Sequence, residues 1–251
     1  MKKFTNKVAV VTGGNSGIGY ATAKELAAEG AKVIITGRNK ESLQKAAGEL
    51  NVTGIVSDQS SLTDIDSLVA TVKEQFGEID VLFINAGVAA FAPIEQVTEA
   101  LLDSTMNINF KGAFFTLQKF LPLLKEGSSV TFLSSVNAQT GMPNTSTYAP
   151  SKAALNSLMR TAAAELAPRK IRVNSVSPGP IKTPIFGKTG LSEDAIKQFA
   201  GAMEARLPAK RFGESQEVAK LVSFLSSNDA LFITGSDYVI DGGLLLQQVF
   251  H

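Results

Sequence analysis

A tyrosine and a lysine in the second half of the chain could perform acid–base chemistry. Tyr148 and Lys152 are four residues apart at the start of an expected helix, so both side chains lie on one face of it. A phenol, with a pKa of about 10, is a poor acid–base group at neutral pH. A nearby ammonium group lowers that pKa, so the pair could act as a general acid and base. The alternative is an ordinary amphipathic helix with this common spacing.

The composition limits what other chemistry is open to the chain. Its 251 residues include no cysteine, which excludes disulfides, thiolate zinc sites and cysteine nucleophiles. The one histidine, His251, is the last residue, so we expect neither a histidine triad nor a metal site. Hydrophobic residues make up 44% and charged residues 19%, and the formal net charge is +1. These values favour a large core and give no sign of nucleic acid or an anionic membrane as a partner.

A glycine-rich turn near the N-terminus could hold a phosphate group. The apolar run Val8–Val11 leads into Thr12-Gly13-Gly14-Asn15-Ser16-Gly17-Ile18-Gly19, and a helical pattern follows over 20–29. Glycine is needed where a backbone turns sharply or lies against a ligand, and the N-terminus of a helix attracts anions. The spacing is G-x-x-x-G-x-G and not the common G-x-G-x-x-G. A turn without a ligand is the alternative interpretation.

Strands and helices alternate along the rest of the chain. We expect strands over 8–11, 32–36, 52–56, 80–84, 128–134, 171–176 and 237–240. We expect helices over 20–29, 41–50, 62–76, 99–125, 148–167, 193–206 and 216–225. Near-continuous apolar strands in this alternation indicate an α/β fold: a Rossmann-type doubly wound parallel sheet with helices on both faces. We expect a single dinucleotide-binding and catalytic domain over 1–251, with 184–213 as a substrate-lid segment within it.

Ligands of such sheets bind outside the carboxyl ends of the strands. The residues at these ends are Thr12-Gly13, Gly37-Arg38, Asp58, Asn85-Ala86-Gly87, Ser134-Ser135 and Pro178-Gly179. We therefore expect all of them to line one crevice.

The motifs at these strand ends together resemble the short-chain dehydrogenase/reductase family from about Lys7 to Gly243. The residues that carry the resemblance are the glycine loop, Asn85-Ala86-Gly87, Asn109, Ser135 thirteen residues before Tyr148, Tyr148-x-x-x-Lys152, Pro178-Gly179 and Thr183. Ser134 and Asn107 are close neighbours of two of these residues, and the spacing in the family favours Ser135 and Asn109.

The resemblance implies a mechanism in which the cofactor delivers hydride to a carbonyl carbon. Ser135 and Tyr148 would hold the carbonyl oxygen, and Tyr148 would donate the proton. Lys152 would lower the pKa of Tyr148 and hydrogen-bond the nicotinamide ribose, and Asn109 would hold a water that connects Lys152 to solvent.

We expect the helix that carries Tyr148 and Lys152 to start close to Tyr148. Pro150 suits the first turn of a helix but disfavours helical geometry at Ala149, the residue before it.

The resemblance also indicates how a nicotinamide cofactor would be held. The expected contacts are Gly13, Asn15, Ser16, Gly17, Ile18, Gly19, Arg38, Asp58, Asn85, Ala86, Gly87, Tyr148, Lys152, Pro178, Gly179, Ile181 and Thr183. An acid after the second strand would favour NAD, but this chain has Arg38, which favours the 2′-phosphate of NADP(H). Asn15 is neutral, so NAD(H) stays open. Asp58 could meet the adenine or simply cap the following turn.

The expected substrate pocket has a mostly apolar lining, which suggests an uncharged ketone or aldehyde. Its residues are Ser135, Val136, Asn137, Met142, Tyr148, Pro180, Ile185 and Phe186, although the apolar ones could instead pack a small satellite core. Five basic residues permit two interpretations, a surface that favours an acidic carrier protein or a solvated face: Lys182, Lys188, Arg206, Lys210 and Arg211.

The leading hypothesis is an NADP(H)-dependent carbonyl reductase. The alternatives are a 3-oxoacyl-[acyl-carrier-protein] reductase, a sugar dehydrogenase and a nucleotide-sensing protein without turnover. An enoyl reductase is disfavoured because such relatives usually space the tyrosine and lysine more widely.

No apolar segment is long enough for a signal peptide or a membrane span, so we expect a cytoplasmic protein. Relatives use the C-terminal end and two long helices to assemble, so we expect a homotetramer.

Overall fold

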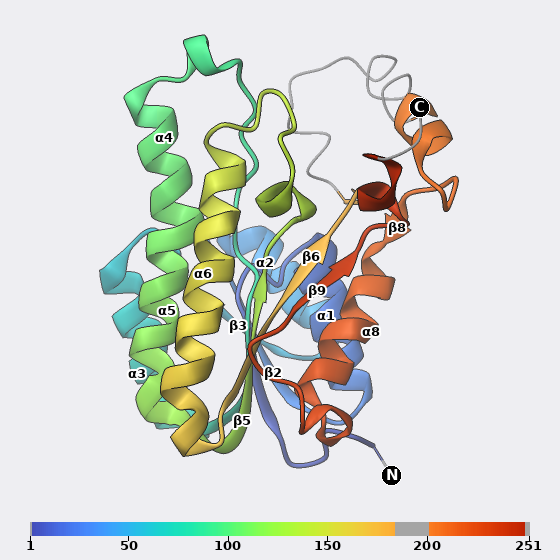
Figure 1. Ribbon diagram of the computed structural model, residues 1–251. Coiled ribbons are helices and arrows are strands. Elements are labelled where there is room, and N and C mark those ends of the chain that lie inside the picture. Colours follow the sequence, from blue (N-terminus) through green and yellow to red (C-terminus); the bar gives the residue numbers. More distant parts are fainter. Residues whose placement is uncertain (1, 184–200, 249–251) are drawn as a thin grey trace.

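A parallel seven-stranded sheet forms the centre of the protein, in a computed structural model that describes residues 2–183 and 201–248 (Figure 1). Its strand order is β3-β2-β1-β4-β5-β6-β9. The strands are β1 (Val8–Val11), β2 (Lys32–Gly37), β3 (Thr53–Val56), β4 (Ile79–Ile84), β5 (Leu124–Leu133), β6 (Arg172–Pro178) and β9 (Asp237–Ile240). Every neighbouring pair is parallel. The predicted doubly wound Rossmann-type sheet is therefore confirmed.

Helices cover both faces of the sheet (Figure 1). One layer holds α1 (Gly17–Ala28), α2 (Lys40–Leu50) and α8 (Ser215–Ser226). The other holds α3 (Leu62–Phe76), α4 (Glu99–Met106), α5 (Ala113–Phe120) and α6 (Tyr148–Leu166). The side chains of adjacent strand residues pack against opposite helix layers, since Val10 packs with the second layer and Val11 with the first. Burial on both faces explains why the strands are almost continuously apolar.

Strand order reverses at β1, which lies between β2 and β4. The chain moves outward from β1 to β2 and β3, then crosses back to β4 on the other side. In sheets of this kind, ligands bind at the carboxyl ends of the two strands where the order reverses. The glycine-rich turn follows β1, and Asn85-Ala86-Gly87 follows β4.

The prediction of one continuous helix over 99–125 is wrong, because the helix is interrupted and ends earlier. A π-helical turn, η2 (Asn107–Gly112), separates α4 from α5, and a short 3-10 turn containing Pro122 ends the helix at η3 (Leu121–Leu123). β5 begins at Leu124, not at residue 128, and a bulge between Ile79 and Val81 accommodates its extra residues against β4. Proline at the beginning of a new turn favours this break.

The segment beyond β6 is described only in part. A small sheet joins β7 (Ile181–Lys182) to β8 (Gly213–Glu214), and residues 201–206 are helical. Residues 184–200, which include most of the expected lid and the start of the expected helix over 193–206, lie outside the described residues.

The remaining short turns are η1 (Ile94–Gln96), η4 (Val136–Gln139), η5 (Ala167–Arg169), η7 (Asn228–Ala230) and η8 (Leu244–Gln248). Within 2–183 and 201–248, no helix has the length and apolar character of a membrane span.

Candidate active site

The glycine-rich turn packs so tightly that side chains would not fit in it. Gly13 and Gly17 have φ angles of 65° and 55°, in the left-handed region that favours glycine. A Cβ on Gly14 would lie 2.6 Å from the side chain of Ile35, and one on Gly19 would collide with the Gly13 carbonyl oxygen. The turn is thus held close to both β2 and the start of α1.

The end of β4 is fastened to this turn by reciprocal hydrogen bonds. The Asn85 side-chain amide donates to the carbonyl oxygens of Thr12 (2.8 Å) and Gly13 (3.1 Å). The Thr12 hydroxyl oxygen accepts from the backbone N–H groups of Asn85 and Ala86, each at 3.0 Å. The sequence motif Asn85-Ala86-Gly87 and the glycine turn are therefore joined at the carboxyl ends of β4 and β1.

The N-terminus of α1 differs from those of its neighbours. Asn39, Ser61 and Thr98 each accept a hydrogen bond from the first turn of α2, α3 and α4. Ser16, the corresponding residue of α1, makes no such side-chain cap and is exposed. The first N–H groups of α1 can therefore face an anion beside a turn whose glycines leave room for it. These residues fit the pyrophosphate of a dinucleotide.

Asn109 is buried, with 1% of its surface exposed, in the π-helical turn. Its carbonyl oxygen accepts from the Val88 N–H at 2.8 Å, and its amide donates to the Val88 carbonyl oxygen at 2.9 Å. The same amide donates to the Ser151 hydroxyl at 3.0 Å, which links the loop after β4 to α6. Asn107 is exposed, so the two asparagines lie in different environments. Single π-helical turns inside helices often mark functional sites.

Ser135, Tyr148 and Lys152 meet at the carboxyl end of β5. Helix α6 begins at Tyr148, as Pro150 requires, and the Tyr148 hydroxyl is hydrogen-bonded to Ser135. The Lys152 ammonium group lies 5.8 Å from the centre of the Tyr148 ring and donates to the Leu133 carbonyl oxygen at 2.8 Å. The Ser134 hydroxyl points to α6 instead, where it donates to the Lys152 carbonyl oxygen at 3.3 Å.

Burial dominates the acid–base properties of this pair. It raises the pKa of Tyr148 above its usual value of 10, and the hydrogen bond with Ser135 acts in the opposite direction. Burial also lowers the pKa of Lys152 to about 8. The sequence-based expectation that Lys152 lowers the pKa of Tyr148 is therefore corrected, because Ser135 is the group that lowers it in this arrangement.

The residues expected around the adenosine end of a cofactor lie in different settings. Arg38 is exposed directly after β2. The Asn15 amide donates to the Ser42 hydroxyl, in the first turn of α2, at 3.1 Å. One Asp58 carboxylate oxygen accepts from the Ser60 N–H (2.9 Å) and hydroxyl (2.7 Å), so Asp58 does cap the following turn.

The remaining predicted cofactor contacts follow β6 at the carboxyl end of the sheet. The Gly179 N–H donates to the Ile240 carbonyl oxygen at 2.9 Å, and a Cβ on Gly179 would lie 2.7 Å from the Asp241 Cα. Thr183 is half-buried, whereas the Ile181 side chain is buried in the core beneath α1 and α8. The Ile181 side chain therefore belongs to the core, and its backbone lies in the small sheet with β8.

The predicted substrate residues are not all equally accessible. Met142 is exposed and Asn137 half-buried, with its N–H donating to the Ser135 hydroxyl oxygen at 3.2 Å. Val136 is buried, so its side chain serves the core more than a pocket. Ile185 and Phe186 lie outside the described residues.

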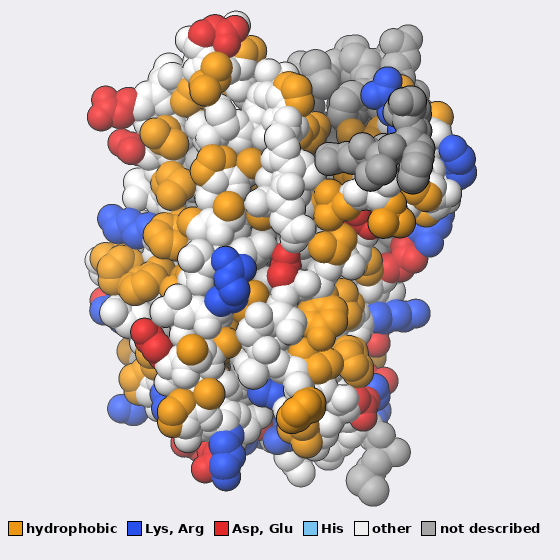
Figure 2. Space-filling model, viewed as in Figure 1, with side chains coloured by type: hydrophobic (Ala, Val, Ile, Leu, Met, Phe, Trp, Pro, Cys, Tyr) orange, Lys and Arg blue, Asp and Glu red, His pale blue; other side chains and the backbone are white. Residues whose placement is uncertain are grey.

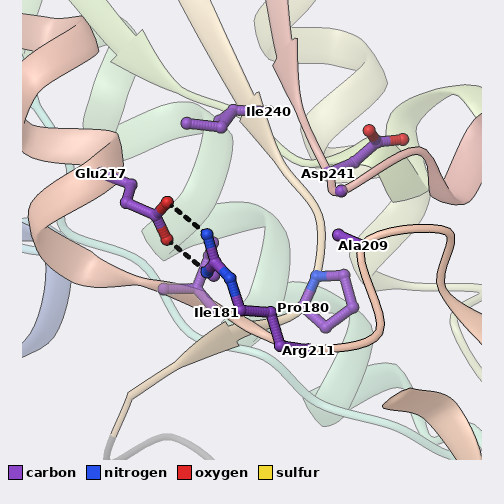
Figure 3. A pocket seen from close by; sticks show the side chains of 9 residues that line it. Pro180, Ile181, Ala209, Arg211, Glu217, Ile240 and Asp241 are labelled. Carbon is purple, nitrogen blue, oxygen red and sulfur yellow. Dashed lines mark hydrogen bonds and ion pairs between the residues drawn. The ribbon is translucent and has the colours of Figure 1, made fainter. Parts of the chain in front are cut away.

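Pro180 lines a cavity of about 80 Å³ at the ends of β6 and β9 (Figure 3). The other lining residues are Ile181, Ala209, Arg211, Gly213, Glu217, Ile240, Asp241 and Gly242. Arg211 and Glu217 point toward each other there, with two N–O distances of 2.7 Å (Figure 3). Ser135, Tyr148 and Lys152 are not among the lining residues. The paired charges give this cavity a structural role, and we assign no chemistry to it.

Two residues at the site were missed by sequence reasoning. The Phe91 ring packs edge-on against Tyr148, with the ring centres 6.0 Å apart. The Gln59 amide donates to the carbonyl oxygens of Ala86 (2.8 Å) and Ile108 (3.1 Å), so it joins the end of β4 to the π-helical turn. Phe91 follows Asn85-Ala86-Gly87 closely in sequence, which is a usable signal. Gln59 gives none, because its partners are backbone atoms distant in sequence.

Known proteins resemble the chain over almost its whole length. A family model described as Enoyl-(Acyl carrier protein) reductase matches residues 13–245. Dehydrogenase/reductase SDR family member 4 of Homo sapiens is 40% identical over 248 residues, covering 96% of this chain and 88% of the human protein. The crystal structure of levodione reductase is 35% identical with a TM-score of 0.93, covering 97% of this chain and 99% of that one. A blue fluorescent protein from a metagenomic library, in complex with NADPH, is 31% identical with a TM-score of 0.88, covering 96% and 99%.

Proposed function

Because the chain belongs to the short-chain dehydrogenase/reductase family, we propose that it is an NADP(H)-dependent carbonyl reductase. It would transfer a hydride between NADP(H) and a ketone or aldehyde, or a secondary alcohol in reverse. The observation that carries this proposal is the arrangement of two hydroxyl groups, on Ser135 and Tyr148, beside the buried ammonium group of Lys152. Two donors and a cation together favour negative charge on a carbonyl oxygen.

Each of these side chains has a distinct task in the proposed reaction. Ser135 and Tyr148 both donate to the carbonyl oxygen, and Tyr148 transfers its proton as charge develops there. Its raised pKa keeps the phenol protonated at neutral pH, which suits a proton donor in the direction of reduction. The Lys152 ammonium group, 5.8 Å from the centre of the Tyr148 ring, would hydrogen-bond the nicotinamide ribose, as the family resemblance implies. Asn109 holds the loop after β4 against α6 and would hold a water that connects Lys152 to solvent.

The nicotinamide cofactor supplies the hydride when it is bound. The turn from Gly13 to Gly19 and the uncapped N-terminus of α1 suit its pyrophosphate, and Asn85-Ala86-Gly87 and Pro178–Thr183 would flank its nicotinamide half. Arg38 supports NADP(H) over NAD(H), since an exposed guanidinium after β2 can pair with a 2′-phosphate. The NADPH complex of a structural relative agrees with this preference.

Other reactions of the family receive less support from the site. The family model carries an enoyl reductase description, but the four-residue spacing of Tyr148 and Lys152 favours carbonyl reduction. For a 3-oxoacyl-[acyl-carrier-protein] reductase, two of the basic residues expected to attract an acidic carrier are already in ion pairs: Lys182 with Glu214 and Arg211 with Glu217. A sugar dehydrogenase remains the third enzyme candidate. A nucleotide-sensing protein would not require Ser135, Tyr148 and Lys152 together.

We also propose that the protein is a homotetramer. Large hydrophobic side chains are exposed on α4 and α5 and, in a second group, on α8, on β9 and between them (Figure 2), and Figure 1 shows α4 and α5 on the opposite side of the molecule from α8. Leu102 and Phe114 belong to the first group, and Phe224, Phe232 and Val239 to the second. Two separate self-complementary surfaces on each chain would close into an assembly with dihedral symmetry. Light scattering tests this directly, and a monomer would contradict it.

The experiment that tests the proposed function follows cofactor absorbance during incubation with a panel of simple ketones, aldehydes, sugars and an acylated carrier protein. We expect NADPH to be consumed with simple ketones, and kcat/KM to be lower with NADH. Turnover of the acylated carrier alone would favour the carrier-protein reductase. Cofactor binding without turnover of any compound would favour the nucleotide-sensing protein.

A further inference from the structure

Phe91 is a large hydrophobic side chain that stays 47% exposed beside the candidate acid–base residue. Its ring packs edge-on against Tyr148 at an interplanar angle of 61°, with the ring centres 6.0 Å apart. Such an edge-to-face contact uses only part of an aromatic ring and leaves apolar surface available for a further contact. This residue is not used by the acid–base chemistry described above.

The position of Phe91 is fixed by backbone pairing of two loops. The Ala92 N–H donates to the Asn144 carbonyl oxygen at 2.9 Å, and a β-bridge joins Ala92 to Thr145. The Thr145 carbonyl oxygen in turn accepts from the Ala149 N–H at 2.8 Å, in the first turn of α6. Thr145 is itself 3% exposed, so this connection is buried. The Phe91 ring is therefore held in a defined position relative to Tyr148.

The same two loops carry no charge. Residues 86–94 and 133–147 contain no Lys, Arg, Asp, Glu or His. They also present Met142, which is 37% exposed and whose carbonyl oxygen accepts from the Thr145 hydroxyl at 2.7 Å. A charged substituent would find no partner on these loops, whereas a flat apolar one could lie against Phe91.

A carbonyl oxygen at the hydroxyl groups of Tyr148 and Ser135 brings its substituents close to the Tyr148 ring. Lys152 and the strand-end residue Gly87 occupy one side, where a Cβ on Gly87 would lie 3.4 Å from the Lys152 ammonium nitrogen. Phe91 flanks the ring as well, and its surface remains open. A substituent of the carbonyl group that extends along the Tyr148 ring to Phe91 would thus have an aromatic neighbour.

From these contacts we infer that Phe91 is a specificity-determining residue that favours uncharged ketones with an aromatic ring next to the carbonyl group. The inference rests on the proposed carbonyl reductase function and names the substrate class of that site. Phe91 would contact the substrate ring and take no part in proton transfer.

The test compares acetophenone, which has an aromatic ring, with butanone, which has none. Phe91→Ala should lower kcat/KM for acetophenone about tenfold, the order expected for losing one good aromatic contact. For butanone the change should stay within about twofold. Phe91→Leu keeps apolar bulk and should recover part of the loss. Ile94→Ala is the matched control, because Ile94 is 76% exposed on the same segment, and it should change neither ketone.

A second readout does not depend on turnover. Saturation-transfer NMR of acetophenone with the protein and NADP⁺, which cannot reduce a ketone, should show weaker binding to Phe91→Ala than to the wild type. An equal loss of kcat/KM for both ketones would overturn the inference, because it would mean that Phe91 only positions Tyr148. No loss for either ketone would overturn it too. A wild-type protein that turns over other ketones but not acetophenone would overturn the inference alone, whereas one that turns over no ketone or aldehyde would overturn the proposed function, and the inference with it.

Discussion

The ammonium group of Lys152 lies 5.8 Å from the centre of the Tyr148 ring, yet its hydrogen bond goes to the Leu133 carbonyl oxygen at 2.8 Å. Only 4% of the Lys152 surface is exposed, and no carboxylate forms an ion pair with it within the described parts of the chain. A buried cation without a countercharge is costly. The fold keeps this charge at the place where Tyr148 would release a proton.

Lys152→Met should therefore stabilise the protein while it abolishes turnover. The pKa of Lys152 falls from 10.5 to about 8 in the folded protein, so the folded state holds fewer protons than the unfolded state between these values and stability rises with pH across that window. At pH values below this window, the buried charge lowers the free energy of unfolding by about 3 kcal/mol, which corresponds to the pKa shift. Lys152→Met removes this cost but also loses the hydrogen bond to Leu133, which is worth about 1 kcal/mol. Thermal unfolding of both proteins at about pH 7 and about pH 10 should show a gain that shrinks at the higher pH. A lower stability of Lys152→Met at both pH values would contradict this.

Ser135→Ala should cost far more activity than Ser134→Ala. The Ser135 hydroxyl reaches Tyr148, whereas the Ser134 hydroxyl is occupied by the Lys152 carbonyl oxygen. Removing one donor to a developing oxyanion lowers kcat by about 100-fold to 1,000-fold. Loss of the Ser134 hydrogen bond should instead lower the free energy of unfolding by about 1 kcal/mol and change kcat little. Steady-state kinetics and thermal unfolding of both variants separate the two effects, and equal losses of kcat would count against the assignment of Ser135.

Arg38→Ala should weaken the use of NADPH specifically. If Arg38 pairs with the 2′-phosphate, its loss removes a charge-assisted hydrogen bond and should lower kcat/KM for NADPH by about tenfold or more. The value for NADH should change little, because NADH lacks that phosphate. Lys45→Ala removes the same charge further along α2 and serves as the control. An equal reduction with both cofactors would rule out the proposed contact.

Gly112→Ala should destabilise the protein, although alanine normally favours a helix over glycine by about 1 kcal/mol. A Cβ on Gly112 would collide with the carbonyl oxygen of Gln59, whose side chain braces the π-helical turn. Gly48 lies in α2 with nothing within 4 Å of the same position, so Gly48→Ala should be stabilising. Denaturant unfolding of the two variants should give changes of opposite sign. A stabilising Gly112→Ala would show that the turn can move away from Gln59.

Much of the fold could be predicted because its strands are buried on both faces and its helices are amphipathic. The apolar runs around Val10, Ile34 and Leu82 permit few other structures, and helix α3 has the predicted bounds of 62–76. The break between α4 and α5 could not be predicted. It depends on contacts of Gly112 and Ile108 with Gln59, which is distant in sequence.

The candidate site was predictable where a residue type and its spacing carry the chemistry. Tyr148, Lys152 and Ser135 are brought together as their spacing indicated. The pKa of Tyr148 was not predictable, because it depends on burial that spacing does not reveal. Phe91 was missed although it follows Asn85-Ala86-Gly87 closely in sequence, because its contact with Tyr148 arises from the pairing of two loops.

The central claim is that Tyr148 is the proton donor, and the turnover of Tyr148→Phe tests it most directly. The variant keeps the ring that packs against Phe91 and removes only the hydroxyl that meets Ser135. Stopped-flow and steady-state assays with NADPH and a ketone turned over by the wild type should show kcat lowered by about 1,000-fold, while fluorescence titration shows NADPH binding within about threefold of the wild type. A Tyr148→Phe protein that binds NADPH and retains the wild-type kcat would contradict the account.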